Sequence, residues 1–239
     1  MTMSKVIGHR GLAGEAPENT LASISQAARQ GLAWIEVDVT LLGDGTAVLF
    51  HDRRLNRTTN HTGRLTSLTH TKLTSIDAGS WFSAQFAGEP IPELGTALSL
   101  IKELGLGLNL ELKTNGCHEG RLVDAVLKAL GKSGLSREQL RISSFNHRAL
   151  SHFSTHSDLP VGHLFDRLPL NWQQKAERTG AIAIHLNAAK ASARQILKVR
   201  SAGYELYCYT VNSAGMAKKL IDSGVNGVFS DFPLGVVPK

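Results

Sequence analysis

Short apolar runs alternate with amphipathic segments along most of the chain. Apolar runs at 6–8, 33–39 and 47–50 predict strands, and apolar residues at helical spacing between Asn19 and Gln30 predict the first helix. Further helices are expected at about 94–104, 120–130, 147–156, 172–178, 193–201 and 214–223, and further strands at 108–113, 140–143, 160–165, 181–184, 205–211 and 225–229.

This alternation of strands and helices predicts an α/β fold with a parallel sheet. If the run at 47–50 extends the second strand, the chain holds about eight strand–helix units, which favours closure into a (β/α)8 TIM barrel. An open, doubly wound sheet is the alternative. No GxGxxG motif follows the first strand, which weakens the dinucleotide-binding version of that alternative.

Residues 53–91 break the rhythm, because Arg, Thr, Asn and Ser are common there and patterned pieces are short. We interpret this segment as a small insertion after the second strand region that caps one end of the barrel. A segment of this length has too little apolar surface for a core of its own. The expected organisation is a single domain over 1–239, with the capping region 53–91 inserted in it.

Composition places the chain among ordinary globular proteins. Its 239 residues are close to the roughly 250 typical of one TIM barrel, and 42% are hydrophobic and 19% charged. There is no apolar run of about 18 residues and no secretory pattern at the N-terminus. Cys117 and Cys208 form no disulfide or metal pattern and indicate free thiols. We therefore expect a cytoplasmic protein without stable membrane association.

The formal charge of +6 suits an anionic partner. The lysines and arginines are scattered, however, so most of them are expected to form an ordinary basic surface. Because only 6% of the residues are aromatic and no basic run is interleaved with aromatics, no nucleic-acid partner is expected.

Two histidines directly follow apolar strands. The run at 6–8 ends at His9 and Arg10, and the run at 47–50 ends at His51. Active sites of α/β barrels lie at strand carboxyl ends, an arginine fork fits a phosphate, and imidazole transfers protons near neutral pH. One such histidine is more often a surface or capping residue. Two of them at the ends of adjacent strands favour an acid/base pair.

Carboxylates alternate with apolar residues on two predicted strands. Glu36 and Asp38 lie two residues apart and so face the same side of the second strand, and Glu111 and Lys113 repeat the arrangement on the strand at 108–113. Three inward carboxylates are unfavourable unless their charge is compensated. A hard divalent cation, Mg²⁺ or Ca²⁺, compensates it through carboxylate oxygens. The alternative is a buried ion-pair network with Arg10 and Lys113.

Other polar residues are expected around this pocket. Glu18, Asn19 and Thr20 precede the first helix, where Asn19 or Thr20 can form the N-cap and Glu18 can complement the helix dipole. Glu18 can also orient Arg10 or line the pocket rim, and the two roles are compatible. Tyr209 and Asn212 end a late strand, and Asn212 is an alternative helix cap. His185, at another strand end, is left undecided. The remaining histidines are interpreted as surface residues: His61, His70, His118, His147, His152, His156 and His163.

Seven short motifs then follow one another in order. They are His9-Arg10-Gly11, Pro17-Glu18-Asn19-Thr20, Glu36-Val37-Asp38, His51-Asp52, Glu111-Leu112-Lys113, Tyr209-Thr210-Val211-Asn212 and Ser230-Asp231-Phe232-Pro233. Each is weak alone, but the ordered series spans nearly the whole chain and resembles that of the glycerophosphodiester phosphodiesterase family, in its compact bacterial cytosolic form. Tyr209 and Ser230 stand where many relatives carry Trp and Thr, which we expect to adjust only the substrate pocket.

The resemblance implies a TIM barrel that hydrolyses glycerophosphodiesters, such as glycerophosphocholine and glycerophosphoethanolamine, to sn-glycerol 3-phosphate and an alcohol. It implies one divalent cation, Mg²⁺ or Ca²⁺, ligated by Glu36, Asp38 and Glu111. It also implies that His9 and His51 are the catalytic acid and base and that Arg10 and Lys113 hold the phosphate. The expected partner is thus a small molecule, and formation of a homo-oligomer is left open.

The chemistry hypothesised for this site is attack of the glycerol 2-hydroxyl on phosphorus, which gives a cyclic phosphate that water then opens. Two alternatives remain. One is a lysophospholipase D-like activity, which would need an apolar rim, for which Trp81, Phe82 and Phe86 are the candidates. The other is a non-catalytic barrel that binds a phosphorylated metabolite.

Overall fold

Eight parallel strands form a closed barrel in the computed structural model, which describes residues 3–236. The strands are β1 (Val6–Gly8), β2 (Trp34–Leu41), β4 (Gly107–Leu112), β5 (Leu140–Ser144), β6 (Val161–Phe165), β7 (Ala181–Asn187), β8 (Glu205–Tyr209) and β9 (Gly227–Ser230). Each pairs in parallel with its neighbours, and β1 closes the ring because it pairs with both β9 and β2. The predicted (β/α)8 TIM barrel is confirmed.

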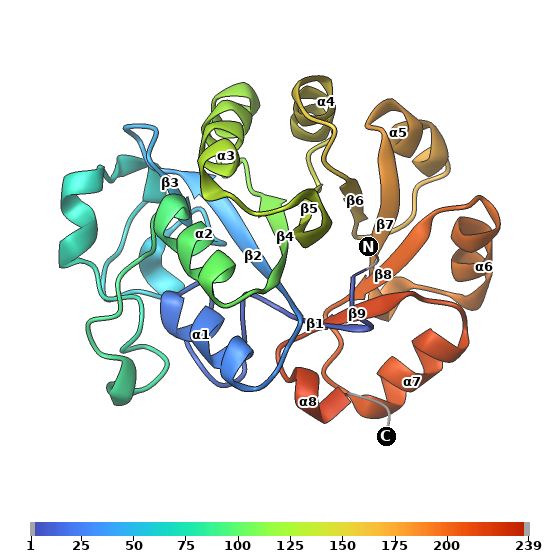
Figure 1. Cartoon of the computed structure of the whole chain (residues 1–239), viewed down its shortest axis with the longest axis horizontal. Coiled ribbons are helices and arrows are strands. Elements are labelled where there is room, and N and C mark those ends of the chain that lie inside the picture. The colour runs from blue at the N-terminus through green and yellow to red at the C-terminus, as the bar shows by residue number, and fades with distance from the viewer. Residues whose placement is uncertain (1–2, 237–239) are drawn as a thin grey trace.

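Helices surround the strands (Figure 1). They are α1 (Leu21–Arg29), α2 (Leu94–Glu103), α3 (Glu119–Ser133), α4 (His147–His156), α5 (Trp172–Arg178), α6 (Ala193–Ser201), α7 (Ala214–Asp222) and α8 (Pro233–Val236). The predicted helices agree with these bounds to within a few residues, and α8 is an addition. Strand ends differ more: β7 continues past His185 to Asn187, and β8 ends at Tyr209, two residues early.

The strand residues divide between two apolar clusters. Ile35, Val37 and Val39 of β2 point outward and pack with helix residues in the large cluster between barrel and helices. The second cluster is small and contains Ile7, Trp34, Ala183, Tyr207 and Phe229. Along β1, Ile7 of this cluster alternates with Val6, which packs outward. This alternation is what turns the polar residues of β2 and β4 toward the barrel axis.

Strand β3 (Ala47–Leu49) is antiparallel to β2 and lies at the end of the sheet order. It therefore does not extend the second parallel strand, as the sequence had suggested, but forms a hairpin with it. The reversal carries the chain back along β2, so that the Phe50 amide donates to the Asp38 carbonyl. His51 consequently arrives beside the middle of β2.

The insertion follows β3 and packs on this hairpin. It contains short 3₁₀ segments at Leu55–Arg57, Leu65–Ser67, His70–Ser75 and Ala84–Phe86. Leu55, Leu65 and Leu73 are buried in a cluster that is completed by Val48 and Phe50, separate from the main core. Two further 3₁₀ turns, Arg137–Gln139 and Ala188–Lys190, belong to the barrel loops. Across residues 3–236, none of the helices has the length and apolar character needed to cross a lipid bilayer.

Candidate active site

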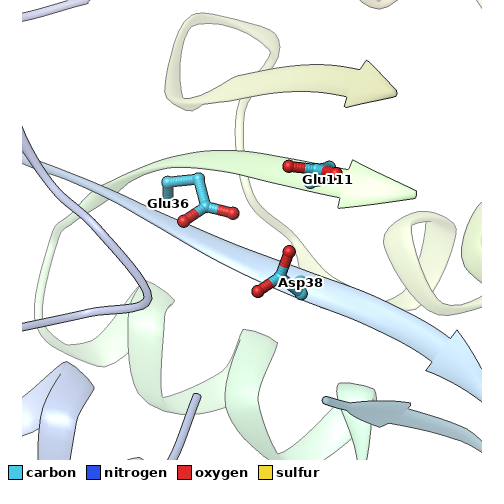
Figure 2. Close-up of side chains that lie close together, drawn as sticks. All are labelled: Glu36, Asp38 and Glu111. Atoms are coloured by element: carbon cyan, nitrogen blue, oxygen red, sulfur yellow. The ribbon is translucent and has the colours of Figure 1, made fainter. Parts of the chain in front are cut away.

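Three buried carboxylates gather at the carboxyl end of the barrel. The register of β2 and β4 places Asp38 beside Glu111 and Glu36 beside Asn109. One oxygen from each of Glu36, Asp38 and Glu111 lies within 4.8 Å of the others. Figure 2 shows the three side chains on the same side of the two neighbouring strands. The two-residue spacing on each strand thus produces the cluster that the sequence predicted.

The carboxylates influence one another strongly. Burial, together with the charges of Asp38 and Glu111, raises the pKa of Glu36 well above its ordinary value. Burial and the charge of Asp38 raise the pKa of Glu111 to about 7. Burial also acts to raise the pKa of Asp38, but the Lys113 and Arg10 cations outweigh it and hold that pKa well below its usual range. The protein alone thus leaves part of this negative charge uncompensated.

The donor set fits a hard divalent cation. The Oε1 atom of Glu36 is buried and accepts no hydrogen bond, and the Oδ1 atom of the neighbouring Asn109 is in the same situation. Buried oxygens without a donor are rare, and carboxylate and amide oxygens are the ligands that Mg²⁺ and Ca²⁺ prefer. The ion pairs of Arg10 and Lys113 do not reach the Oε1 atom of Glu36, so they do not by themselves account for the cluster.

Two cations flank the carboxylates. Arg10 Nε lies 3.3 Å from Asp38 Oδ2, and Arg10 Nη1 donates to Glu18 Oε1 at 2.7 Å. Lys113 Nζ lies 2.8 Å from Glu111 Oε1 and 3.6 Å from Asp38 Oδ1. Both cations line the same cavity as Glu36 and Glu111, where they can meet an anionic substrate.

The loop that carries Arg10 depends on Gly11. Gly11 has φ 86°, and a Cβ there would lie 2.4 Å from Ser23 Oγ of α1. That hydroxyl accepts from the Leu12 amide and donates to the Arg10 carbonyl. Glycine is therefore required for α1 to hold the turn after β1 against the barrel.

Each histidine of the predicted pair is held by a carboxylate. His9 Nδ1 lies 2.7 Å from Asp231 Oδ1, and His51 Nδ1 lies 2.6 Å from Asp52 Oδ1. Such contacts fix the ring and leave Nε2 for proton transfer. Burial lowers the pKa of His51 below its ordinary value, and the charges of Arg10 and Lys113 add to this effect against the opposing charge of Asp38.

A network behind the pocket orients these groups. Arg57 donates to both Asp52 and Glu18, with Nε to Asp52 Oδ2 and Nη1 to Glu18 Oε2 at 2.7 Å each. Glu18 thus joins Arg10 to Arg57. Asn19 is buried and makes two hydrogen bonds to Asp38: its Nδ2 donates to Asp38 Oδ2 at 2.8 Å, and its Oδ1 accepts from the Asp38 amide. Of the two residues predicted as caps, Thr20 caps α1 and Asn19 does not, and no acidic residue lies in the first turn of the helix.

The cavity has a volume of about 310 Å³. It is lined by His9, Arg10, Glu36, His51, Asn109, Glu111, Lys113, Phe145, Leu164, His185, Asn187, Tyr209, Thr210 and Phe229. His185 is 1% exposed and forms part of the inner wall, and Tyr209 donates its hydroxyl to the Phe165 carbonyl. Asn212 does not cap α7. Its Nδ2 donates to Asp231 Oδ2 at 2.7 Å, which braces the carboxylate that holds His9.

The interpretation of His163 is also wrong, and several site residues were not predicted. His163 is not a surface residue: it lies on β6, is 2% exposed and stacks on Phe165. Its place within an apolar strand was the available signal. Asp52 and Asp231 belong to two of the seven motifs, but the sequence did not indicate that each would hold a histidine. The contacts of Arg57 had no signal beyond its nearness to His51.

Fold and site together define an α/β-barrel enzyme with an acidic, cation-flanked cavity at the carboxyl end of its strands. The chain matches the Glycerophosphoryl diester phosphodiesterase family over residues 9–234. The chain belongs to this family and is a phosphoric diester hydrolase.

Individual relatives agree over nearly their full length. The chain is 33% identical over 233 residues to the protein YhdW of Bacillus subtilis (strain 168), covering 95% of this chain and 94% of that one. It is 31% identical over 229 residues to the glycerophosphodiester phosphodiesterase of Caldanaerobacter subterraneus subsp. tengcongensis, with 95% and 94% covered. A phosphodiesterase of Oleispira antarctica, solved in complex with the product sn-glycerol-3-phosphate, superposes with a TM-score of 0.94 at 36% identity, covering 98% of this chain and 95% of that one.

Proposed function

We propose that this enzyme hydrolyses glycerophosphodiesters, such as glycerophosphocholine and glycerophosphoethanolamine, to sn-glycerol 3-phosphate and an alcohol. The observation that carries the proposal is that both histidines, Arg10, Lys113 and two carboxylates of the cluster line one cavity. The product named for the Oleispira antarctica structure supports the choice of the glycerol phosphate half as the recognised part.

Glu36, Asp38 and Glu111 would hold one divalent cation, Mg²⁺ or Ca²⁺. When bound, it would neutralise the anionic phosphodiester and stabilise the charge that develops on its oxygens. Arg10 and Lys113 would contact the same phosphate from the protein side. A guanidinium fork suits two phosphate oxygens and an ammonium suits one.

The two histidines would move the protons. One imidazole takes the proton of the glycerol 2-hydroxyl through Nε2 while that oxygen attacks phosphorus. The bond from phosphorus to the alcohol oxygen breaks, and the second imidazole gives this oxygen a proton. The cyclic phosphate is then opened by water, which loses a proton to one histidine as the other protonates the ring oxygen that leaves.

Release of glycerol 3-phosphate from glycerophosphocholine tests the proposal. The assay uses added Mg²⁺ or Ca²⁺, then EDTA, then His9→Ala and His51→Ala. We expect cation-dependent release that both substitutions abolish. An analogue without the 2-hydroxyl should be inert, and its turnover at a normal rate would contradict the cyclic route. Absence of release from folded protein with either cation would contradict the proposal as a whole.

The same assay, extended to lysolipid micelles, distinguishes the two alternative functions, a lysophospholipase D-like activity and a non-catalytic barrel. The insertion presents Trp81, whose ring packs edge-on against Phe82 and whose Nε1 donates to the Ala78 carbonyl. Contacts of this kind are typical of a side chain that packs on its own segment rather than of an apolar rim that faces a membrane. Choline release from lysolipid micelles, with none from glycerophosphocholine, would favour the lysophospholipase D-like activity. Binding of glycerol 3-phosphate without turnover of either compound would favour a non-catalytic barrel.

A further inference from the structure

A second pocket, lined by three arginines, lies in the insertion next to the catalytic cavity. It has a volume of about 310 Å³. Its lining residues are Arg53, Arg54, Arg64, Thr66, Asn115 and Gly116. No carboxylate is among them, and the three arginines are exposed. The pocket is therefore strongly positive, and solvent reaches it.

The arginines of this pocket lack acidic partners. Arg54 and Arg64 lie directly opposite each other in an isolated antiparallel bridge, which places their side chains on one face. Like charges in that position repel. Within residues 3–236, none of the three guanidinium groups has a carboxylate oxygen within 4.0 Å, whereas the nearby Arg57 is paired with Asp52 and Glu18. An anion between Arg54 and Arg64 would remove the repulsion.

The basic pocket lies next to the catalytic cavity. A smaller pocket of about 160 Å³ shares Arg53 and Asn115 with it, and shares Lys113 and Phe145 with the catalytic cavity. Asn115 fixes this junction, since its Nδ2 donates to the His51 carbonyl at 3.0 Å. The small pocket thus lies between Lys113 and the arginines, in the direction that a group bound at Lys113 would take to reach them.

The side of the cavity between Lys113 and the arginines suits the alcohol half of a substrate. The opposite wall of the catalytic cavity is made of buried residues, among them Leu164, His185 and Phe229. That wall is therefore closed to groups of variable size. On the side of Lys113 the small pocket adjoins the cavity and offers space for the alcohol, which is the part that differs between glycerophosphodiesters.

We propose that Arg53, Arg54 and Arg64 form a subsite for a phosphate group carried by the alcohol of the substrate. The proposal rests on the phosphodiesterase function proposed above and adds a substrate class to it: glycerophosphodiesters whose alcohol bears a phosphomonoester. Guanidinium forks bind phosphate oxygens in pairs, and such charge-assisted hydrogen bonds are stronger than neutral ones. A cationic headgroup such as choline gains nothing from this subsite.

The test compares two substrates that differ by one phosphate: glycerophosphoglycerol, and the same diester phosphorylated on the far glycerol. Glycerophosphocholine is the third substrate, and kcat/KM is measured at low ionic strength with Mg²⁺ or Ca²⁺. We expect wild-type protein to prefer the phosphorylated compound by about 10- to 100-fold. Because salt screens exposed charges, the preference should shrink at high ionic strength.

The double variant Arg54→Gln/Arg64→Gln should lose this preference while its kcat/KM for glycerophosphocholine stays within about twofold of wild type. Arg53→Gln is a second variant that leaves the Arg54–Arg64 bridge intact, and it should reduce the preference in part. Arg137→Gln, which removes an exposed arginine beside Asp158 and outside this pocket, is the matched control and should leave the preference unchanged.

The outcomes separate the two proposals. Turnover of glycerophosphocholine without any preference for the phosphorylated diester would overturn the subsite and leave the phosphodiesterase function standing. The same holds if the preference survives in a folded double variant. No turnover of any of the three diesters would overturn both.

Discussion

His9 and Asp231 stand 222 residues apart in the chain, yet His9 Nδ1 lies 2.7 Å from Asp231 Oδ1. The contact exists because β1 pairs with β9, where Gly8 aligns with Ser230. The closing of the barrel therefore assembles half of the proposed acid/base pair. Asn212 stabilises this arrangement from the other side by donating to Asp231 Oδ2.

Replacing Asp231 with Asn should lower kcat strongly with little change in fold. The amide removes the carboxylate that orients the His9 ring and fixes its tautomer, and loss of such an orienting carboxylate lowers turnover by about 10² to 10⁴. Steady-state kinetics on glycerophosphocholine measure the effect. Asp222→Asn, which removes an exposed carboxylate paired with Lys218, is the control and should keep full activity. Normal turnover by Asp231→Asn would contradict a role for His9 in the proton transfer.

Arg57→Gln should reduce kcat/KM by about tenfold. Arg57 holds Asp52 behind His51 and Glu18 behind Arg10, so its loss loosens both. Removal of this cation should also raise the pKa of His51 and move the limb of the pH–rate profile that His51 controls to higher pH. Arg148→Gln, at an exposed pair with Glu119, should change neither value. A lower rate with an unmoved profile would indicate a general loss of stability rather than a positioning role.

Divalent cation should stabilise the protein against heat independently of any turnover. A ligand at 100 times its Kd stabilises the folded state by about 2.7 kcal/mol, which for a chain of this size moves Tm upward by several degrees. Glu36→Gln should abolish the Tm increase caused by Mg²⁺ or Ca²⁺, because Glu36 contributes the buried oxygen without a donor. Glu103→Gln, at an exposed helix position, should retain the increase. An equal increase in both variants would place the cation elsewhere.

Acid should destabilise the protein in part through His163. Burial lowers the pKa of His163 to about 4 from an ordinary value of 6.5. Above pH 6.5 the ring is neutral in both states. Between pH 6.5 and 4 the unfolded chain binds a proton that the folded protein does not, so stability falls as the pH falls, by up to about 3 kcal/mol.

Denaturant unfolding of His163→Gln across this pH range measures that contribution. The variant lacks the titrating ring, so its free energy of unfolding should fall less between pH 6.5 and 4 than that of wild type. His61→Gln, at an exposed position outside every helix and strand, should follow the wild-type curve. Parallel curves for His163→Gln and wild type would contradict a buried, neutral His163.

The local pattern of the sequence decided most of the fold. The spacing of Glu36 and Asp38 against Ile35, Val37 and Val39 determines which side chains enter the barrel, because alternate strand residues face opposite sides. The helices at 147–156, 172–178 and 193–201 were predicted with the observed bounds. The prediction that histidines and carboxylates meet at one end follows from the parallel direction of neighbouring strands.

Other features depend on contacts between distant segments. The direction of β3 is set by the hairpin with β2 and the cluster around Phe50, and a run of four apolar residues carries no direction. The burial of His163 follows from its neighbours in the closed barrel. The partners of His9 and Arg57 come from other segments, and periodicity describes only one segment at a time. Sequence therefore determined which side chains face inward, and the closure of the barrel decided which of them touch.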